Sequence, residues 1–460
     1  MTEGLLDQEK SIGLIIWTLA WPAILEQILQ VSVTYVDSAM VGSLGAAATA
    51  AVSVPTSTIW LVNGWMNAFA IGYAVLMARN IGGRRFERAR MITRQALVTA
   101  LIFGAILSTV FTLIAQVLPK WIGAEEHVQT LARGYYTVIA LAYLPNLLMI
   151  TISSLMRLSG DTRTPLLLNT LNNILNIILN MFFIFGEVDL GPITIHGLGL
   201  GVKGAAIATS LAVTITAILL FIIWLTRPSI IQLELNQSFA LNREIQKNAF
   251  RLGLPVGLER STLSFGQIVL TKIVGSLGTT ALAAHFLANT AEAMTYLPAS
   301  GVSTAATTLV AQSLGRGDKT LAKRFGNATT LIGTLLMTTM GVVLYFTAPY
   351  LMGFFTRDRN VIALGTTILR IEAFVEPAFG LSMLVFGVFR GSGDTRRPFY
   401  ISIAGMWVVR LPLALFMVRC TSLGLVGIWI GMASDLLLRG IIGLAMFLRY
   451  GWLESSSDVH

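Results

Sequence analysis

The sequence predicts an all-α integral membrane protein with 12 transmembrane helices in two pseudo-symmetric six-helix bundles. The first observation is its composition: 55% of the 460 residues are hydrophobic and only 12% are charged, against about 25% charged in soluble domains. The second is that long apolar segments alternate with short polar gaps along the whole chain. The third is that the sequence repeats itself. A soluble fold could not bury this much apolar surface, so lipid must cover it.

Twelve segments are long and apolar enough to cross a hydrocarbon core of about 30 Å. We expect helices near 14–41, 47–78, 92–118, 131–156, 165–186, 203–226, 249–275, 281–312, 325–352, 362–389, 399–419 and 424–448. Several exceed the roughly 20 residues that a span needs, so they should tilt, kink or project from the bilayer.

The basic residues predict the orientation of these helices. The net charge of +9 comes largely from arginines and lysines in the short connections on one side, such as 84–90, 157–163, 316–324 and 390–397. Cytoplasmic loops carry such an excess. We therefore expect a multi-pass protein of the cell inner (plasma) membrane with both termini cytoplasmic. This location explains the basic residues, so we expect no nucleic acid partner. The first ten residues are polar and acidic, which argues against a cleavable signal peptide.

The two halves of the chain align without gaps at an offset of 233 residues. Pro22 then matches Pro255, Glu26 matches Glu259, and the segment 157–165 matches 390–398. In the segments 157–165 and 390–398, glycine should end one helix and aspartate should cap the next helix. Because each half has an even number of helices, both should have the same orientation. We expect an N-terminal lobe at 1–226, a cytoplasmic linker at 227–248 and a C-terminal lobe at 249–460.

The first predicted helix carries the residues that most resemble a switch. Ionisable side chains inside a membrane span are costly and are functional candidates. Glu26 and Asp37 lie 11 residues apart, or about three turns, so they share a face. Pro22 removes a backbone hydrogen bond and should bend or weaken the helix. Protonation of Asp37 could then change what this helix packs against, although Asp37 lies near the loop at Gly42 and could instead be a solvated acid.

The predicted helix 165–186 carries a row of amides. Four asparagines, Asn169, Asn173, Asn176 and Asn180, follow one another at intervals of 4, 3 and 4 residues, which places them on one face. Lipid cannot satisfy amides, so this face must contact other helices or a wet cavity. The spacing fits equally well a structural contact between helices and a polar wall that binds a proton, a cation or a substrate.

Charged residues of the second half lie near or inside predicted spans. We expect two structural ion pairs there, Arg410 with Asp435 and Lys272 with Glu292, because buried charges usually occur in pairs. Glu259 matches Glu26 in the repeat, which favours an architectural role. The sequence leaves the roles of Glu372 and Glu376 open.

Signatures of enzymes and of metal sites are missing. The sequence lacks a phosphate-binding loop of the Walker A type and the HExxH metalloprotease motif. One cysteine, Cys420, cannot form a thiolate cluster. We expect no enzymatic activity, no metal and no cofactor, so an ion gradient or the membrane potential must drive any transport.

The chain resembles the multidrug and toxic compound extrusion (MATE) transporters, and within them the DinF-like branch. The resemblance covers essentially the whole chain. It is carried by the six-plus-six duplication, by Pro22 and the segment 37–42 on the first helix, by 78–83, and by the twin motifs at 157–163 and 390–396.

The resemblance implies cation-coupled antiport that exports small organic, often cationic, compounds by alternating access. Asp37, Asn176 and Asn180 match the proton- or cation-binding positions of the family. Pro22 matches the proline at which the first helix bends. Gln30 and Thr209 match positions that line the substrate cavity.

One departure from the family pattern bears on the coupling ion. Relatives carry an aspartate where this chain has Asn180, so Asp37 is the only clear titratable group of the site. This favours the proton over sodium. We expect small organic molecules and the lipid bilayer as partners, and a monomer. The alternatives are an exporter or flippase for a dedicated metabolite or lipid-linked precursor, and a channel or scaffold that does not transport by alternating access.

Overall fold

The computed structural model describes residues 11–189, 194–233 and 237–454. Helices dominate it, and the described residues contain one short two-stranded antiparallel hairpin. The chain forms two compact units. Unit 1 consists of Leu25–Met77 and Arg85–Phe250, and unit 2 consists of residues 11–24, Ala78–Arg84 and the chain from Arg251 onward.

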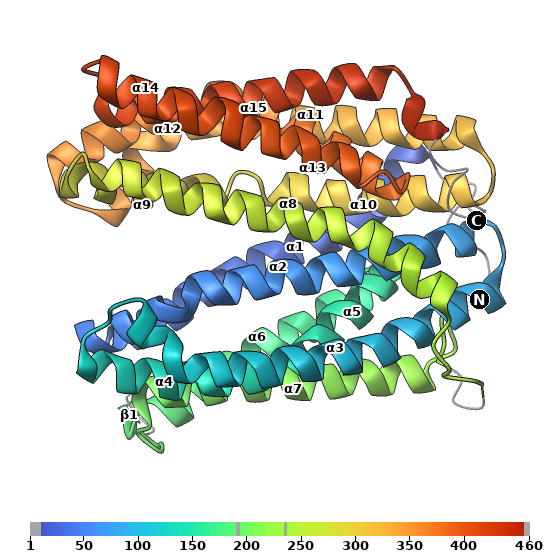
Figure 1. The fold of residues 1–460 in the computed structure, drawn as a ribbon, viewed down its shortest axis with the longest axis horizontal. Helices are drawn as coiled ribbons and strands as arrows, with labels where there is room; N and C mark the ends of the chain where they lie inside the picture. Colours follow the sequence, from blue (N-terminus) through green and yellow to red (C-terminus); the bar gives the residue numbers. More distant parts are fainter. Residues whose placement is uncertain (1–10, 190–193, 234–236, 455–460) are drawn as a thin grey trace. The chain divides into compact units, whose positions relative to one another are not determined.

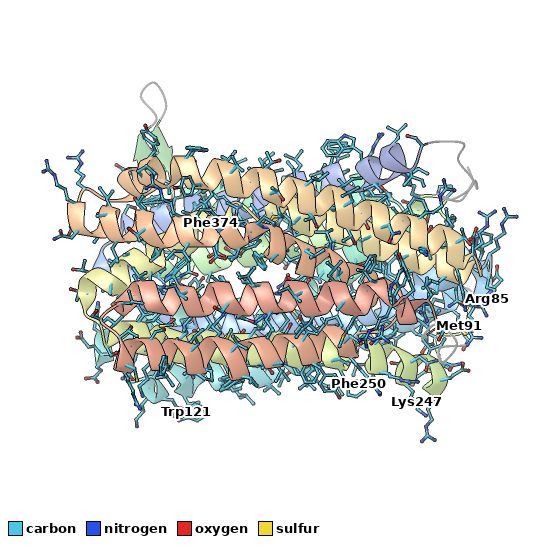
Figure 2. The ribbon with its side chains drawn as sticks, turned by 90° about the horizontal axis from the view of Figure 1, so that it is seen from above. Arg85, Met91, Trp121, Lys247, Phe250 and Phe374 are labelled. Atoms are coloured by element: carbon cyan, nitrogen blue, oxygen red, sulfur yellow. The ribbon has the colours of Figure 1, made fainter. Side chains whose placement is uncertain are left out.

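Unit 1 holds the first elements of the chain, most of which Figure 1 labels. They are most of α1 (Ile12–Gly42) and α2 (Ala46–Gly82), then α3 (Phe86–Trp121), α4 (Glu126–Leu141), α5 (Tyr143–Ser159), α6 (Arg163–Ile184), β1 (Glu187–Asp189), β2 (Thr194–His196) and α7 (Gly201–Thr226). Figure 2 shows Arg85 and Trp121 at opposite ends of α3, with Lys247 and Phe250 toward the Arg85 end.

Unit 2 holds the remaining elements. They are most of α8 (Arg243–Gly275), then α9 (Thr279–Ala293), α10 (Leu297–Gly315), α11 (Lys319–Phe355), α12 (Arg359–Gly391), α13 (Arg396–Ile403), the π-helical segment η2 (Ala404–Arg410), α14 (Leu411–Cys420), α15 (Gly424–Leu448) and the 3₁₀ turn η3 (Gly451–Leu453). The first turns of α1 also belong to this unit, where Ile16 and Leu19 pack with Val302 and Leu309 of α10.

Small residues form much of the helix contacts in each unit. In unit 1, Ala48 and Ala51 of α2 pack with Ala132 of α4 and Ala205 of α7. Small side chains let helix backbones approach closely, which is how membrane helices gain packing energy in lipid. Large apolar side chains such as Leu113 and Ile178 are instead exposed, as expected of a surface that faces lipid.

Three predicted spans are interrupted where a proline follows. The segment 131–156 breaks between α4 and α5 ahead of Pro145, and 281–312 breaks between α9 and α10 ahead of Pro298. The helix widens into η2 ahead of Pro412. A proline cannot donate to the carbonyl four residues earlier. At the first break that freed carbonyl, of Leu141, accepts a 3.2 Å hydrogen bond from Ser108 Oγ.

The helices confirm an all-α membrane protein. In the described part of the chain, nine helices are long and apolar enough to cross a membrane, or ten if α4 and α5, bent by 45°, form one span. The other predicted spans, 249–275 and 281–312, are occupied by α8 and by α9 with α10. The number 12 for the membrane crossings therefore stays a prediction.

The twin motifs end and start helices as expected. Asp161 Oδ1 accepts a 3.0 Å hydrogen bond from the backbone N–H of Thr164 in the first turn of α6. Asp394 Oδ1 accepts a 3.2 Å hydrogen bond from the backbone N–H of Arg397 at the start of α13. Gly160 adopts a φ of 109° and Gly393 one of 78°, values that favour glycine. The predicted capping by both aspartates is confirmed.

The connection after α7 is bound to unit 1 by a polar network. Gln246, in the first turn of α8, accepts hydrogen bonds from Tyr73 and, at 3.1 Å, from Thr99. It donates to Gln95 Oε1 at 3.1 Å, and Gln95 donates to the carbonyl of Ala240 at 2.7 Å. Unit 1 accordingly extends to Phe250, so the chain passes into unit 2 within helix α8.

Candidate functional site

A buried polar contact joins α1 to α6 in unit 1. Asn180 Nδ2 donates to Asp37 Oδ1 at 2.6 Å and to Asn176 Oδ1 at 3.1 Å. Both asparagines are almost completely buried, at 3% and 1% exposed, and Asp37 is half-buried. The structure therefore brings together the three residues that the sequence singles out for the proton or cation.

The contact continues from α6 to α7. Asn176 Nδ2 donates to Thr209 Oγ1 at 3.0 Å, which links Asp37 to Thr209 through two amides. We call these four residues the Asp37 cluster. Gln30 lies seven residues before Asp37 on α1 and is exposed. Its side chain forms no hydrogen bond with the Asp37 cluster in the described structure.

A second polar cluster lies further toward the start of α1. Glu26 Oε1 accepts a 2.8 Å hydrogen bond from Arg157 of α5 and a 2.7 Å hydrogen bond from Asn169 of α6. We call these residues the Glu26 cluster. Glu26 and Asp37 are 11 residues apart, and so are their partners Asn169 and Asn180. Helices α1 and α6 therefore contact each other in parallel and in register, at two points about 16 Å apart along the helix.

Three asparagines of the row form hydrogen bonds with neighbouring helices. Asn169 and Asn180 bind α1, and Asn176 binds α7. Asn172 Oδ1 also accepts from Thr216 of α7, at the long distance of 3.5 Å. An amide that bonds to its neighbour across a helix contact fixes the helix register. The Oδ1 atom of Asn180 is buried and accepts no hydrogen bond from the described residues. Asn180 bonds to Asp37 and therefore belongs both to a contact between helices and to the candidate proton or cation site.

Unit 2 repeats the Glu26 cluster but not the Asp37 cluster. Arg390 donates to Glu259 Oε2 at 3.0 Å, and Ser402 Oγ donates to Glu259 Oε1 at 3.1 Å. These three residues lie 233 positions after Glu26, Arg157 and Asn169. The residue that matches Asp37 is Leu270, which is completely buried in the apolar core of unit 2. The ion pair is thus present in both units, whereas the Asp37 cluster is specific to unit 1.

Unit 2 contains its own buried charges. Asp435 binds Arg410 at 2.8 Å and Arg439 at 2.6 Å, which confirms the predicted pair of Arg410 with Asp435. Gly405 allows this contact, because a Cβ atom there would overlap the Asp435 carboxylate. Glu372 is completely buried, and its carboxylate oxygens accept no hydrogen bond within the described ranges.

The predicted pair of Lys272 with Glu292 is wrong. These side chains form no ion pair among the described residues, and Lys272 is exposed in the last turn of α8 whereas Glu292 is buried. Opposite charges in adjacent spans pair only when they face each other at one depth. Glu376, also buried, accepts a hydrogen bond from Thr295.

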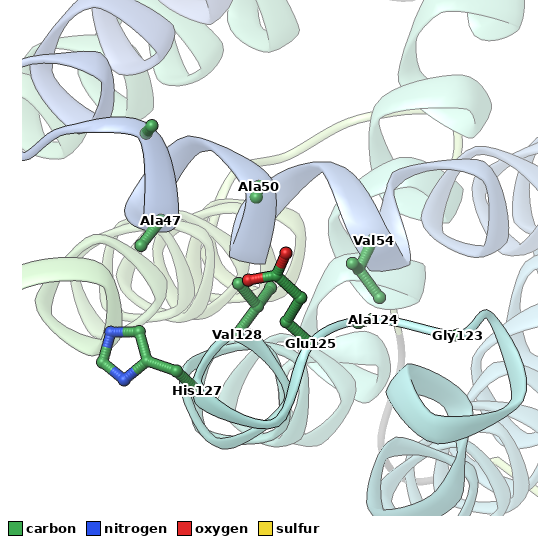
Figure 3. Close-up of a pocket in the computed structure, with 9 residues that line it drawn as sticks. Ala47, Ala50, Val54, Gly123, Ala124, Glu125, His127 and Val128 are labelled. Carbon is green, nitrogen blue, oxygen red and sulfur yellow. The ribbon is translucent and has the colours of Figure 1, made fainter.

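A shallow pocket of about 470 Å³ lies in unit 1, at the start of α2 and the connection between α3 and α4. Figure 3 shows Glu125 and His127 on one side of it and Ala47 and Ala50 on the other. None of the predicted site residues lines this pocket. In the described ranges no three His, Cys, Asp or Glu side chains are grouped to hold a metal ion.

Sequence reasoning missed the partner of Glu26. Arg157 belongs to a motif that the sequence explains as helix ends, yet its guanidinium binds Glu26 from 131 positions away. The repeat could have indicated this ion pair, because Glu26 and Arg157 both have identical counterparts at the same offset. Pro22, the predicted hinge, is buried within an uninterrupted α1.

Comparisons with known proteins agree on one class. The family model MatE matches residues 22–182 and 255–416. A protein of Thermotoga maritima named "Probable multidrug resistance protein NorM" is 28% identical, over 94% of this chain and 92% of its own length. A solved transporter of the MOP superfamily from Pyrococcus furiosus superposes with a TM-score of 0.88 at 23% identity, over 95% of this chain and 96% of that one.

Proposed function

Because the chain belongs to the MATE family of membrane transporters, we propose that it is a cation-coupled antiporter that exports small organic compounds. The chain is a transporter and not an enzyme. The name of its Thermotoga maritima relative, a probable multidrug resistance protein, supports organic compounds as the cargo. Alternating access between the two sides of the membrane is the mode of transport that fits a duplicated helical fold.

The observation that carries the proposal is the hydrogen bond between Asp37 and Asn180. A charged carboxylate accepts a stronger hydrogen bond from an amide than a neutral carboxylic acid does. A proton that binds to Asp37 therefore weakens the hold of α6 on α1. Release of the proton restores it. The position of α1 then depends on the protonation of one residue, which is the coupling that an antiporter needs.

The composition of the Asp37 cluster supports a proton, and not sodium, as the coupling ion. It contains one carboxylate, two amides and one hydroxyl. Asn180 turns an N–H donor toward Asp37, and a donor opposes a cation at that point. A sodium ion would need the amide to rotate and offer its oxygen. A proton needs no such change.

Transport in everted membrane vesicles tests this assignment. Efflux of a fluorescent organic cation is measured under an imposed proton gradient and, separately, under an imposed sodium gradient. We expect Asp37→Asn to abolish proton-driven efflux and Glu125→Gln, an exposed acid of the same unit, to leave it intact. Full proton-driven efflux by Asp37→Asn would falsify the coupling role of Asp37.

A second candidate coupling site is supported by the buried acids of unit 2. Glu372 is fully buried with no hydrogen-bond partner for its carboxylate in the described ranges, and Glu376 and Glu292 are also buried. A buried acid in a membrane span is a candidate for binding a proton or cation. Under this alternative, sodium drives efflux, Glu372→Gln abolishes it, and Asp37→Asn retains it.

A further inference from the structure

Helix α3 carries a buried guanidinium that has no counterion among the described residues. Arg94 is 4% exposed, and neither its Nε nor its Nη1 has a hydrogen-bond partner. An arginine stays protonated in proteins, so Arg94 cannot avoid the cost of burial by losing its proton. A buried charge without a partner is strongly unfavourable. The site therefore needs an anion that this part of the chain does not supply.

Other arginines of the described structure do have partners. Four of them also contain a buried nitrogen without a hydrogen bond, but each binds a protein oxygen through another nitrogen; they are Arg79, Arg133, Arg390 and Arg397. Near Arg94 on α3, Arg88 binds Glu244 at 2.7 Å and Arg90 binds Glu87 at 3.2 Å. These two acids are thus already bound to other arginines, and Arg94 is left without an acid.

The connection after α7 passes across α3 beside Arg94. Arg90, one turn before Arg94, donates from Nε to the carbonyl of Ile230 at 3.3 Å. Gln95, the residue after Arg94, donates to the carbonyl of Ala240 at 2.7 Å. Because both of these neighbours on α3 bind the same connection, Arg94 lies between α3 and that connection. All of these residues belong to unit 1.

Arg94 is also the last charged residue before the apolar part of α3. The next one is Lys120, so the 25 residues from 95 to 119 carry no charge. At 1.5 Å per residue they extend about 37 Å, enough to cross a hydrocarbon core of about 30 Å. Side chains on a helix point back toward its N-terminus, which directs Arg94 away from this apolar stretch. Its guanidinium is therefore expected at the depth of the lipid phosphates.

The surroundings of Arg94 suit an anionic lipid. Residues 84–94 contain five arginines against one glutamate, and anionic lipids are attracted to such basic segments. Figure 2 shows Arg85 and Met91 at the same end of the molecule as Lys247 and Phe250. Met91 and Phe250 are exposed apolar side chains, which can contact acyl chains. A guanidinium binds a phosphate group through two parallel hydrogen bonds.

We propose that Arg94 is the centre of a phosphate-binding site on the basic side of unit 1, between α3 and the connection after α7. The ligand is a phosphate group, carried either by an anionic phospholipid or by a soluble phosphate. Because Arg94 is buried, the connection moves aside to admit the phosphate. The site shares no residue with the Asp37 cluster, and its binding can be measured without transport.

Thermal unfolding of the delipidated full-length protein in detergent tests the site. The rise of the unfolding temperature with ligand concentration gives a dissociation constant, since a ligand that binds only the folded state stabilises it. Phosphatidylglycerol and inorganic phosphate are titrated separately, which distinguishes a lipid from a soluble source. Phosphatidylcholine, whose headgroup has no net charge, is the lipid control. We expect phosphatidylglycerol to protect the parent protein and phosphatidylcholine to protect it less.

Variants with a matched control assign the binding to Arg94. Arg94→Gln should weaken the binding of phosphatidylglycerol about tenfold to hundredfold, as expected for the loss of hydrogen bonds to a charged group. Arg85→Gln is the control, because it removes the same charge from an exposed arginine at the start of the same helix. It should change the dissociation constant less than about threefold, since exposed charges contribute little. Arg94→Lys keeps the charge without the planar fork and should lie between the parent and Arg94→Gln.

The unfolding temperature without ligand gives a second, independent readout. Arg94→Gln should unfold at the same temperature as the ligand-free parent or a higher one, because it removes an uncompensated buried charge. A clearly lower unfolding temperature would show that Arg94 already has a partner within the protein, and it would overturn the proposal.

The titrations have equally definite outcomes. Protection by inorganic phosphate alone, lost in Arg94→Gln, would support the site and identify a soluble phosphate as its ligand. Protection by phosphatidylglycerol that is lost in Arg94→Gln would identify the lipid. The proposal fails if neither ligand protects the parent, if Arg94→Gln is protected as well as the parent, or if phosphatidylcholine protects as well as phosphatidylglycerol.

Discussion

Replacing Arg157 with alanine removes the cation from the Glu26 cluster and leaves a buried carboxylate with one amide partner. The pair is 2.8 Å long, and its side chains are 17% and 12% exposed. Loss of one partner costs about 3–5 kcal/mol for a buried ion pair and about 0–1 kcal/mol for an exposed one. The small exposure places Arg157→Ala near the lower end of the buried range, at about 3 kcal/mol.

The free energy of unfolding in mixed detergent micelles, followed by circular dichroism, measures this loss. Glu26→Gln in the Arg157→Ala background removes the uncompensated charge and should restore about 2 kcal/mol, because the penalty comes mainly from the unpaired carboxylate. Arg390→Ala is the internal comparison. Its partner Glu259 is only 4% exposed, so the loss should be at least as large. A coupling energy between Glu26 and Arg157 below about 0.5 kcal/mol, the level of a surface pair, would refute this reasoning.

Three further predictions concern other contacts. Asn180→Asp places a second carboxylate beside Asp37, so efflux should become stimulated by sodium; unchanged efflux under a sodium gradient contradicts this. Gln246→Ala removes hydrogen bonds that hold the connection after α7. Limited proteolysis between 227 and 242 should therefore become about fivefold faster, because each buried hydrogen bond contributes about 1 kcal/mol. Gly405→Ala should lower the free energy of unfolding by about 1–3 kcal/mol through overpacking. Gly443→Ala is the control, because a Cβ atom there lies 3.6 Å from its nearest neighbour, and it should leave thermal unfolding almost unchanged.

The sequence predicts well whatever depends on local pattern. The asparagine row and the spacing of Glu26 and Asp37 indicate shared faces because side chains repeat along a helix with a fixed period. The repeat also predicts that Glu259 has the same role as Glu26, and both bind an arginine of their own unit. The breaks ahead of Pro145 and Pro298, by contrast, differ from the prediction, which has 131–156 and 281–312 as continuous spans.

Contacts between distant segments are harder to predict. Gln95 and Gln246 are 151 positions apart, and no periodicity marks either of them as a partner of the other. Lys272 and Glu292 carry opposite charges in adjacent helices, yet only the structure tells that one is exposed and the other buried. Gly82 and Gly315 are equivalent in the repeat, and a Cβ atom at either one would overlap a backbone carbonyl of unit 2, that of Gln312 or of Arg79. A glycine at both positions, however, fits a turn as well as a close contact.

The passage of the chain between its two units has a mechanical consequence. The chain changes units within α1 after Ile24, within α2 after Met77 and within α8 after Phe250. Each of these three passages lies inside a continuous helix and not in a loop. Pro22 and Pro255 lie close to two of these joints and each remove one hydrogen bond of the helix there. Pro22 and Pro255 therefore mark the positions at which α1 and α8 bend most easily.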